Sequence, residues 1–344
     1  MTDGRGTRLL RAVLPLALVA LLAGCSAVPS LPGASPAPSA SATAPTVTPT
    51  VMPSGAFSKP SKGGPTLGPV GDGPLAGKVI VVDPGHNGAF NPAYHNARVS
   101  SAIGGTKCME SGTESDEKPA FGEHELNWQV SQFVVTRLLA EGATVILTRP
   151  DDEGVGPCNP ERAEIANRAG ADFFLSVHGD GERLGRNGIA DPQGFHVQIE
   201  KRIVGGAALY DRSLAAAENM IRQLTAMTEE PLSNYVPRQP PGIWQRTGEL
   251  AVLAGLETTP GVLVEVGNMK NPANLARLKD PATQDALAAA MVAAIEDTLL
   301  KPEFQTPTSK PTPTPTATPS GSASASPSAS ESPTATASTP GETP

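Results

Sequence analysis

This 344-residue chain has few aromatic residues and no cluster of basic residues, and both features limit the classes of function that it can have. Aromatic residues make up 4% of the chain, and 34 acidic residues outnumber 26 lysines and arginines, which gives a net charge of −8. Neither a basic cluster nor a ladder of aromatic residues appears. Because these features are typical of nucleic-acid-binding surfaces, we expect no nucleic acid partner. Internal repeats are also absent.

A long hydrophobic run is missing too, since the apolar stretch Ala12–Ala23 is too short for a comfortable membrane span. Three arginines precede it and small residues follow it, a pattern that predicts a signal peptide over residues 1–25. Leu22–Cys25 resembles the bacterial lipobox, whose cysteine is lipidated. We therefore expect Cys25 to anchor an exported protein to the outer face of the membrane, facing the cell-wall or periplasmic space. An ordinary secretory signal with a chance cysteine is the alternative.

Residues 26–75 and 302–344 contain mainly proline, serine, threonine and alanine, with little to bury. Such segments do not offset their ordering entropy, so we expect both to be disordered. The first suits a spacer between lipid and domain. The second is a wall-embedded segment, an O-glycosylation site or a simple tail. Residues 76–301 remain, which is enough for a single domain with a large core.

Cysteine is rare, and its count is informative. Three are present, and Cys25 is assigned to the signal, leaving Cys108 and Cys158. A remaining pair in an exported chain predicts a disulfide across a loop of about 50 residues. Two free thiols or metal ligands are the alternative.

Apolar runs alternate with helical patterns along the domain. The expected strands are 78–83, 143–148, 172–177, 195–200 and 261–267, and the expected helices are 123–141, 161–169, 211–227, a short one after Pro272, and 281–300. This alternation predicts an α/β domain with a mostly parallel, twisted sheet flanked by helices on both faces. Residues 89–121 show no periodicity, and residues 235–256 are expected to be largely irregular.

Polar residues that can perform chemistry end three of these strands: His86, His178 and Glu265. The carboxyl ends of parallel strands meet at one edge of a sheet, so these side chains can converge. Glu123 and Glu125 open a helix that starts near the same edge. Two histidines, a carboxylate and an open position form the ligand set of a catalytic zinc site, which leaves Glu265 as a base.

Each of these residues also has an ordinary structural interpretation. His178 is then a hydrogen-bonded histidine in the core, and the two glutamates are acids in the first turn of a helix, where the helix dipole favours them. Glu265 then forms an ion pair with an arginine such as Arg149 or Arg162. Three histidines lack a strand-end position: His95, His124 and His196. For the last of these, inside a strand, we expect simple packing.

Four motifs in order resemble the zinc-dependent N-acetylmuramoyl-L-alanine amidases of the type 3 family. They are Val82–His86, Glu123 with Asn127, Leu175–His178 and Val264–Asn268, with Arg162 and Ala166-Asn167 also fitting. The resemblance covers nearly all of the domain. It implies Zn²⁺ held by His86, Glu123 and His178, with Glu265 catalytic, and it selects Glu123 over Glu125. The implied reaction is hydrolysis of the amide between the lactyl group of N-acetylmuramic acid and L-alanine, in peptidoglycan or muropeptides.

The sequence departs from the family pattern in two places. Gly179-Asp180-Gly181 stands where many relatives carry Ala-Asn-Ala. The Cys108/Cys158 pair is absent from many members, although it resembles the bridge of an exported actinobacterial subgroup. No inserted long helix of the autoinhibitory kind is indicated, and no second wall-binding domain is visible. We expect a monomer. A catalytically silent peptidoglycan-binding module and a stem-peptide peptidase are the alternative functions.

Overall fold

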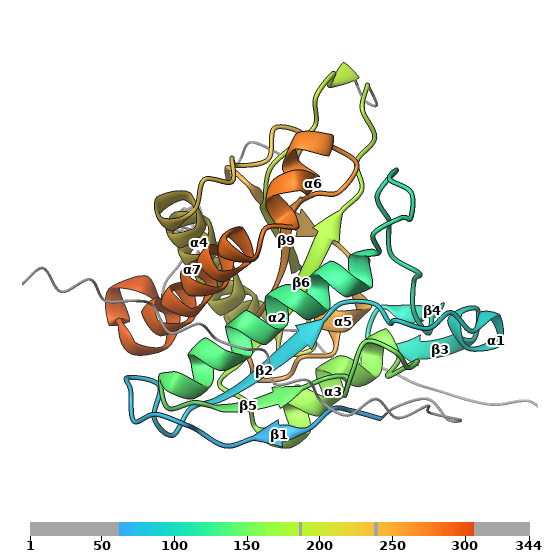
Figure 1. Ribbon diagram of the computed structural model, residues 1–344. Coiled ribbons are helices and arrows are strands. Elements are labelled where there is room, and N and C mark those ends of the chain that lie inside the picture. The colour runs from blue at the N-terminus through green and yellow to red at the C-terminus, as the bar shows by residue number, and fades with distance from the viewer. Residues whose placement is uncertain (1–61, 186–187, 237–239, 306–344) are drawn as a thin grey trace, which may run out of the picture. The chain divides into compact units, whose positions relative to one another are not determined.

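A seven-stranded sheet is the centre of the computed structural model, which describes residues 62–185, 188–236 and 240–305 (Figure 1). The strand order is β1-β5-β2-β6-β9-β7-β8. The strands are β1 (Thr66–Leu67), β2 (Val79–Pro84), β5 (Thr144–Leu147), β6 (Phe173–Asp180), β7 (His196–Glu200), β8 (Ile243–Arg246) and β9 (Gly261–Asn268). Pairing is parallel except between β1 and β5 and between β7 and β9. The expected α/β class with a mostly parallel sheet is confirmed.

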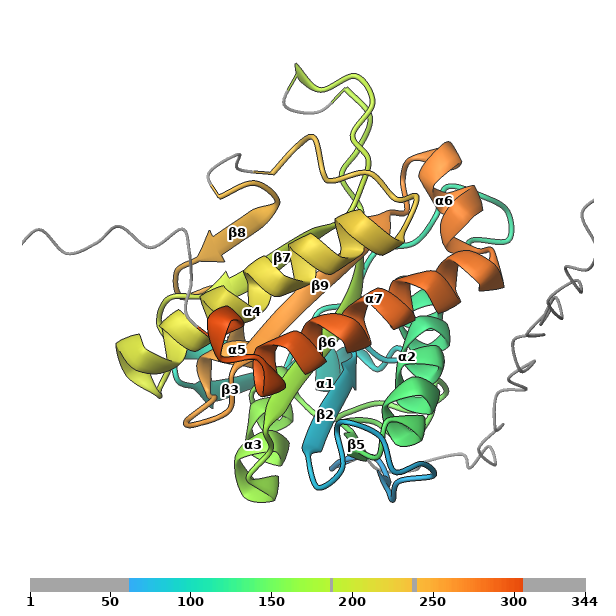
Figure 2. The ribbon, with the colours of Figure 1, turned by 90° about the vertical axis from the view of Figure 1, so that its left-hand side faces the viewer.

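Helices cover both faces of this sheet. One face packs on three long helices: α2 (Glu123–Ala140), α4 (Gly206–Met227) and α7 (Pro281–Leu300). Figure 2 shows these three lying across the sheet. The other face packs on two shorter helices, α3 (Asn159–Ala169) and α5 (Ala251–Ala254). A further helix, α6 (Pro272–Leu278), joins β9 to α7, and the turn η2 (Pro302–Phe304) follows α7.

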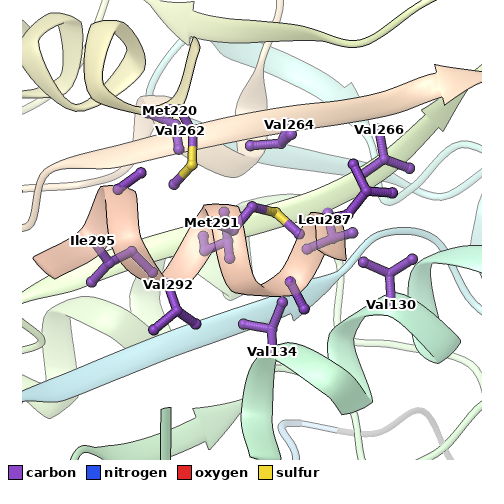
Figure 3. Close-up of a cluster of buried hydrophobic side chains, with 14 of the residues drawn as sticks. Val130, Val134, Met220, Val262, Val264, Val266, Leu287, Met291, Val292 and Ile295 are labelled. Atoms are coloured by element: carbon purple, nitrogen blue, oxygen red, sulfur yellow. The ribbon is translucent and has the colours of Figure 1, made fainter. Parts of the chain in front are cut away.

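Alternation along β9 fixes which of its side chains face each layer. Val262, Val264 and Val266 are fully buried and pack toward α7, where Met291 lies in the same cluster (Figure 3). Burying one valine stabilises the fold by about 1.5–3 kcal/mol, so a one-residue slip that exposed all three would be strongly disfavoured. The intervening residues, Glu265 among them, therefore face the opposite side of the sheet.

The α3 and α5 layer leaves the carboxyl half of its sheet face open. Phe174 and Leu263 belong to the apolar cluster under these helices. Further along the same face, β6 carries His178 and β9 carries Glu265, and both residues line a groove. The short second layer thus positions a site on the face of the sheet as well as at its edge.

The structure adds elements where the sequence showed no periodicity. The segment expected to lack regular structure contains α1 (Pro92–His95) and a hairpin of β3 (Arg98–Ser101) and β4 (Gly104–Lys107). The α4 helix starts five residues before the expected Asp211. Both additions are short stretches that contain polar residues or glycine and lack the apolar periodicity by which the other elements were predicted.

Ordered structure also begins before the expected domain start at Ala76. Strand β1 lies in the range expected to be linker, and its pairing with β5 is antiparallel. Backbone hydrogen bonds such as Gly64 N to Leu147 O, 2.9 Å long, attach this segment, and composition carries no signal for them. The predicted signal peptide, Cys25 and most of the predicted C-terminal tail lie outside the described residues. Within the described part, no helix combines the length and apolar character that crossing a membrane requires.

Candidate metal centre and active-site groove

His86 follows β2 in a backbone conformation that is uncommon for a residue with a side chain, with φ of 62°. Such a conformation costs about 1–3 kcal/mol and persists only where its surroundings hold it. Two buried arginines do so. Arg149 Nε donates to Pro84 O at 2.9 Å, and Arg162 donates to Pro84 O at 3.0 Å and to His86 O at 2.8 Å. The turn that presents His86 is therefore fixed from the interior.

Asp83 connects this turn to the neighbouring strands. Its carboxylate accepts hydrogen bonds from Arg162 at 2.7 Å, from Ser176 at 2.6 Å and from Thr148 at 2.5 Å. Burial opposes the charge of Asp83, but Arg162 and the two hydroxyls outweigh it and hold the pKa of Asp83 below its usual value. The fully buried ion pair of Asp83 and Arg162 thus has the hydrogen-bond partners that buried charges require.

Three side chains from three elements converge beyond the turn. His86 Nε2 and His178 Nδ1 lie 3.0 and 2.9 Å from the same atom, Glu123 Oε1. The three candidate ligand atoms all lie within 4.8 Å of one another. His86 Nδ1 lies 2.9 Å from Glu110 O, where it donates as an N–H and leaves Nε2 free to bind a cation. The other oxygen of Glu123 accepts from Thr113 N at 2.7 Å.

The other candidates of the same residue types lie outside this cluster. Glu125 accepts a hydrogen bond from Gln129 on its own helix. His124 Nδ1 lies 3.0 Å from each carboxylate oxygen of Asp152, and His95 bonds the backbone at the start of its own short helix. The structure therefore brings together His86, Glu123 and His178 and separates Glu125 from them.

Two glycines allow the backbone to lie directly against the cluster. A Cβ on Gly85 would stand 2.3 Å from two ring atoms of His178. Gly112 has φ of 81°, and a Cβ there would stand 2.9 Å from the ring of His86 and 3.0 Å from Glu123 Oε2. Any larger residue would displace a member of the cluster. The role of Gly112 was not predicted, because it lies in the segment without periodicity.

The donor set suits a divalent metal. Two imidazole nitrogens and one carboxylate oxygen form the protein side of many catalytic zinc sites, which keep a further position open. Burial opposes the charge of Glu123, and the two histidines outweigh this effect and lower the pKa of Glu123. The carboxylate is thereby held in the anionic form that a metal requires.

Glu265 lies beside the cluster on the adjacent strand, as the register partner of His178. Its Oε1 accepts a hydrogen bond from Gln198 at 2.9 Å, whereas its buried Oε2 has no partner among the described residues. Burial, followed by the charges of Asp180 and Glu123, raises the pKa of Glu265 well above its usual value. A carboxyl with one free oxygen and a raised pKa is suited to accept and return a proton.

One expectation about Glu265 is corrected, and the structure excludes the alternative interpretation. Glu265 lies in the middle of β9 rather than at the end of the strand, because the site extends over the open face of the sheet. It also forms no ion pair with either candidate arginine. Arg162 binds Asp83, and Arg149 binds Asp152 at 2.7 Å.

Comparison with known proteins identifies the family. Residues 80–297, well over half of the chain, match the sequence profile of N-acetylmuramoyl-L-alanine amidases. The chain belongs to this family. The N-acetylmuramoyl-L-alanine amidase Rv3717 of Mycobacterium tuberculosis is 35% identical over 224 residues, covering 64% of this chain and 86% of that protein.

Solved structures agree with this assignment. The amidase Ami1 of Mycobacterium smegmatis is 35% identical, with a TM-score of 0.59, covering 65% of this chain and 98% of that one. The apo form of Ami1 from Mycobacterium abscessus is 34% identical, with a TM-score of 0.58, covering 65% and 99%. This chain is an amidase on the same fold, and the expected actinobacterial resemblance is confirmed.

The groove of the amidase has a volume of about 720 Å³ and contains the cluster at one end. Asp180, which departs from the family pattern, lies in this groove, and its Oδ2 is 4.0 Å from His196 Nε2. Burial lowers the pKa of His196 to about 3, with Arg246 adding to the effect. His196 Nδ1 has no hydrogen-bond partner among the described residues. The expectation of a simply packed His196 therefore misses a neutral imidazole beside the site.

Period-two alternation predicts that His196 and Gln198 share one face of a strand, but it does not show what that face meets. His196 is the register partner of Glu265, and Gln198 follows two residues later on the same face. The sequence fixes the spacing of these residues, but their approach to Glu265 depends on β7 pairing with β9 in the antiparallel direction. That pairing had no signature in the sequence.

The expected disulfide between Cys108 and Cys158 is present in the amidase. Cys158 is the N-cap of α3, and Asn159 N donates to Cys108 O at 2.7 Å. Glu110, which orients His86, lies two residues after Cys108. The disulfide therefore attaches the loop that contacts the cluster to the helix that carries Arg162.

Proposed function

We propose that this amidase is a zinc-dependent hydrolase that cleaves the amide between the lactyl group of N-acetylmuramic acid and L-alanine. The observation that carries the proposal is the convergence of His86, Glu123 and His178 beside Glu265, in a chain of this family. Its substrate is peptidoglycan or muropeptides, and its role is wall remodelling or recycling.

In this proposal His86, Glu123 and His178 hold the metal ion, and the buried arginines and close-packed glycines keep the three ligands in place. A bound zinc ion supplies a Lewis acid that polarises the scissile carbonyl and lowers the pKa of water toward 7. His86 Nδ1 donates a hydrogen bond to Glu110 O, and Glu123 Oε2 accepts one from Thr113 N, so His86 Nε2 and Glu123 Oε1 are left to hold the ion.

Glu265 moves the proton. It accepts a proton from the attacking water and returns it to the nitrogen of the leaving L-alanine, so that an amine rather than an amide anion departs. Gln198 holds one carboxyl oxygen and leaves the other free for this transfer. The raised pKa of Glu265 favours its protonated form, which the second half of the reaction needs as an acid.

Mass spectrometry of digested muropeptides tests the reaction. The expected products are an intact glycan and a free stem peptide that begins with L-alanine. Cleavage inside the stem would indicate a peptidase instead. Tight binding to peptidoglycan with no release of peptide would indicate a catalytically silent module.

We also propose that the amidase is exported and lipid-anchored. The proposal rests on the pattern of residues 1–25, the lipobox-like Leu22–Cys25 and the spacer-like composition that follows. Labelling of cells with an alkyne fatty acid should tag the wild-type protein, and Cys25→Ser should abolish the tag and release the protein from membranes. Equal labelling of both proteins would contradict the anchor. Size-exclusion chromatography with light scattering tests the expected monomer.

A further inference from the structure

The groove continues well beyond the cluster, toward the edge strand β8. Gln198, which binds Glu265, is the register partner of Trp244. Register partners point to the same face of a sheet, so Trp244 and, two residues on, Arg246 share the face that carries Glu265. Both line the groove. A continuous polar and aromatic floor therefore leads from Glu265 to the edge of the sheet.

Trp244 is held as a platform at the far end of this floor. The guanidinium carbon of Arg246 lies 4.1 Å from the centroid of the Trp244 ring, which is a stacked arrangement. Arg246 is in turn paired with Glu249. Among the described residues that line the groove, Trp244 is the single tryptophan, tyrosine or phenylalanine. Trp244 as a whole residue is half-buried, and it lines the groove beside the stacked guanidinium of Arg246.

The lining of the groove includes both apolar and polar side chains besides Trp244. Ala251, Val252 and Leu263 supply aliphatic surface, whereas Arg246 and Glu249 supply planar hydrogen-bonding groups. This combination matches an N-acetylated sugar. The C–H face of a pyranose packs on an aromatic ring, the acetamido methyl needs an apolar contact, and the hydroxyls need donors and acceptors.

A second hollow of about 520 Å³ lies on the other side of the loop that carries Gly112 and Thr113, which line both cavities. It contains Arg183 and Lys270, the latter paired with Asp116 at 2.6 Å. Cationic side chains suit the carboxylates of a stem peptide better than a neutral sugar. Phe90 and Glu114 also line this second hollow, so the proposal rests on the chemistry of the first groove and not on a contrast between the two.

We propose that Trp244 and Arg246 form a saccharide subsite that receives the N-acetylmuramic acid ring of the substrate. The proposal rests on the proposed function and specifies which end of the groove takes the glycan. Trp244 is a specificity-determining residue in this account, because its contact distinguishes a muramoyl amide from an ordinary peptide amide.

Binding of the two product halves to the zinc-loaded, full-length protein tests this assignment. The probes are N-acetylmuramic acid and the dipeptide L-alanyl-D-isoglutamine, each titrated by ligand-observed NMR. Trp244→Ala should lower the affinity for N-acetylmuramic acid about tenfold. Trp244→Phe should lower this affinity less, because an aromatic face remains. Neither should change the affinity of the dipeptide by more than about twofold.

Tyr210→Phe is the matched control. Tyr210 donates to Gln245 at 2.8 Å from the α4 side, so its loss disturbs β8 without touching the groove. It should change the affinity of neither probe. Equal weakening of both probes by Trp244→Ala would reduce Trp244 to a structural support. A selective loss of dipeptide affinity would assign this end to the peptide, and unchanged or undetectable binding of N-acetylmuramic acid to the wild type and Trp244→Ala would also overturn the proposal.

Hydrolysis separates this outcome from failure of the proposed function. Wild-type protein that releases L-alanyl-D-isoglutamine from N-acetylmuramoyl-L-alanyl-D-isoglutamine upholds the reaction, whatever Trp244→Ala does to binding. In that assay, the saccharide subsite predicts a rise in KM for Trp244→Ala with a smaller change in kcat.

Discussion

His178 and Glu265 are register partners on the parallel strands β6 and β9, so a candidate metal ligand and the proposed proton carrier lie on adjacent strands. Neighbouring strands lie about 4.8 Å apart, which fixes this spacing independently of any loop. The other two candidate ligands are His86, on the turn after β2, and Glu123, at the start of α2. The sheet therefore sets the spacing of His178 and Glu265, and segments at its edge position His86 and Glu123.

Removing one candidate ligand should remove the metal. We expect His86→Ala and His178→Ala to bind much less than the one zinc ion per chain expected of the wild type, because two ligands rarely hold the ion. Atomic absorption after gel filtration measures the ratio. His124→Ala is the matched control, since His124 contacts Asp152 and lies outside the cluster. Full occupancy in His86→Ala would contradict the assignment of ligands.

Arg162→Lys should weaken metal binding without removing a ligand. Lysine keeps the charge but does not reproduce the fork of bonds to Asp83, Pro84 O and His86 O, so the strained turn loses support. We expect zinc affinity to fall about tenfold in a chelator competition assay. Arg168→Lys on the same helix is the control, because Arg168 is exposed and pairs with Glu164, away from the turn. Equal affinities in the two variants would show that the clamp is dispensable.

The central strands and the cluster were predictable because their signals are local. The run before His86 is continuous and β-branched, and the run before His178 is rich in large apolar residues, as expected for strands buried on both faces. The two-residue β1 and the edge strand β8 are held by backbone pairing with distant segments, which leaves no pattern in composition. The same limit hid Gln198 and Trp244, since their approach to Glu265 depends on the order and direction of β9, β7 and β8.

Loss of the disulfide should weaken both the fold and the site. Cys108 and Cys158 are 50 residues apart, and opening a loop of this size is expected to lower the free energy of unfolding by about 4 kcal/mol. The Cys108→Ser/Cys158→Ser variant should also bind zinc more weakly, because Glu110 O and Thr113 N belong to the released loop. Denaturant titration and chelator competition measure the two effects. Unchanged zinc affinity in a destabilised variant would show that the loop keeps its position without the bond.

His196 should make the protein sensitive to acid. Its pKa falls from an ordinary 6.5 to about 3 in the fold, so the folded state binds fewer protons than the unfolded state between these values. The stability from neutral His196 is complete above pH 6.5 and is lost as the pH falls toward 3, by about 1.4 kcal/mol per pH unit. Between pH 6.5 and 5 the wild type should therefore lose about 2 kcal/mol more than His196→Gln. Urea unfolding at the two pH values measures this difference, and parallel losses in both proteins would contradict the buried neutral state.

The most direct test of the account is a paired measurement on Glu265→Gln: zinc content and release of L-alanine-terminated peptide from muropeptides. Because Glu265 carries the proton and is not a ligand, we predict full zinc occupancy together with a loss of turnover of about 10²–10⁴-fold. Turnover at the wild-type rate in the zinc-loaded variant would contradict the catalytic assignment, and loss of zinc from the variant would contradict the separation of metal binding from proton transfer.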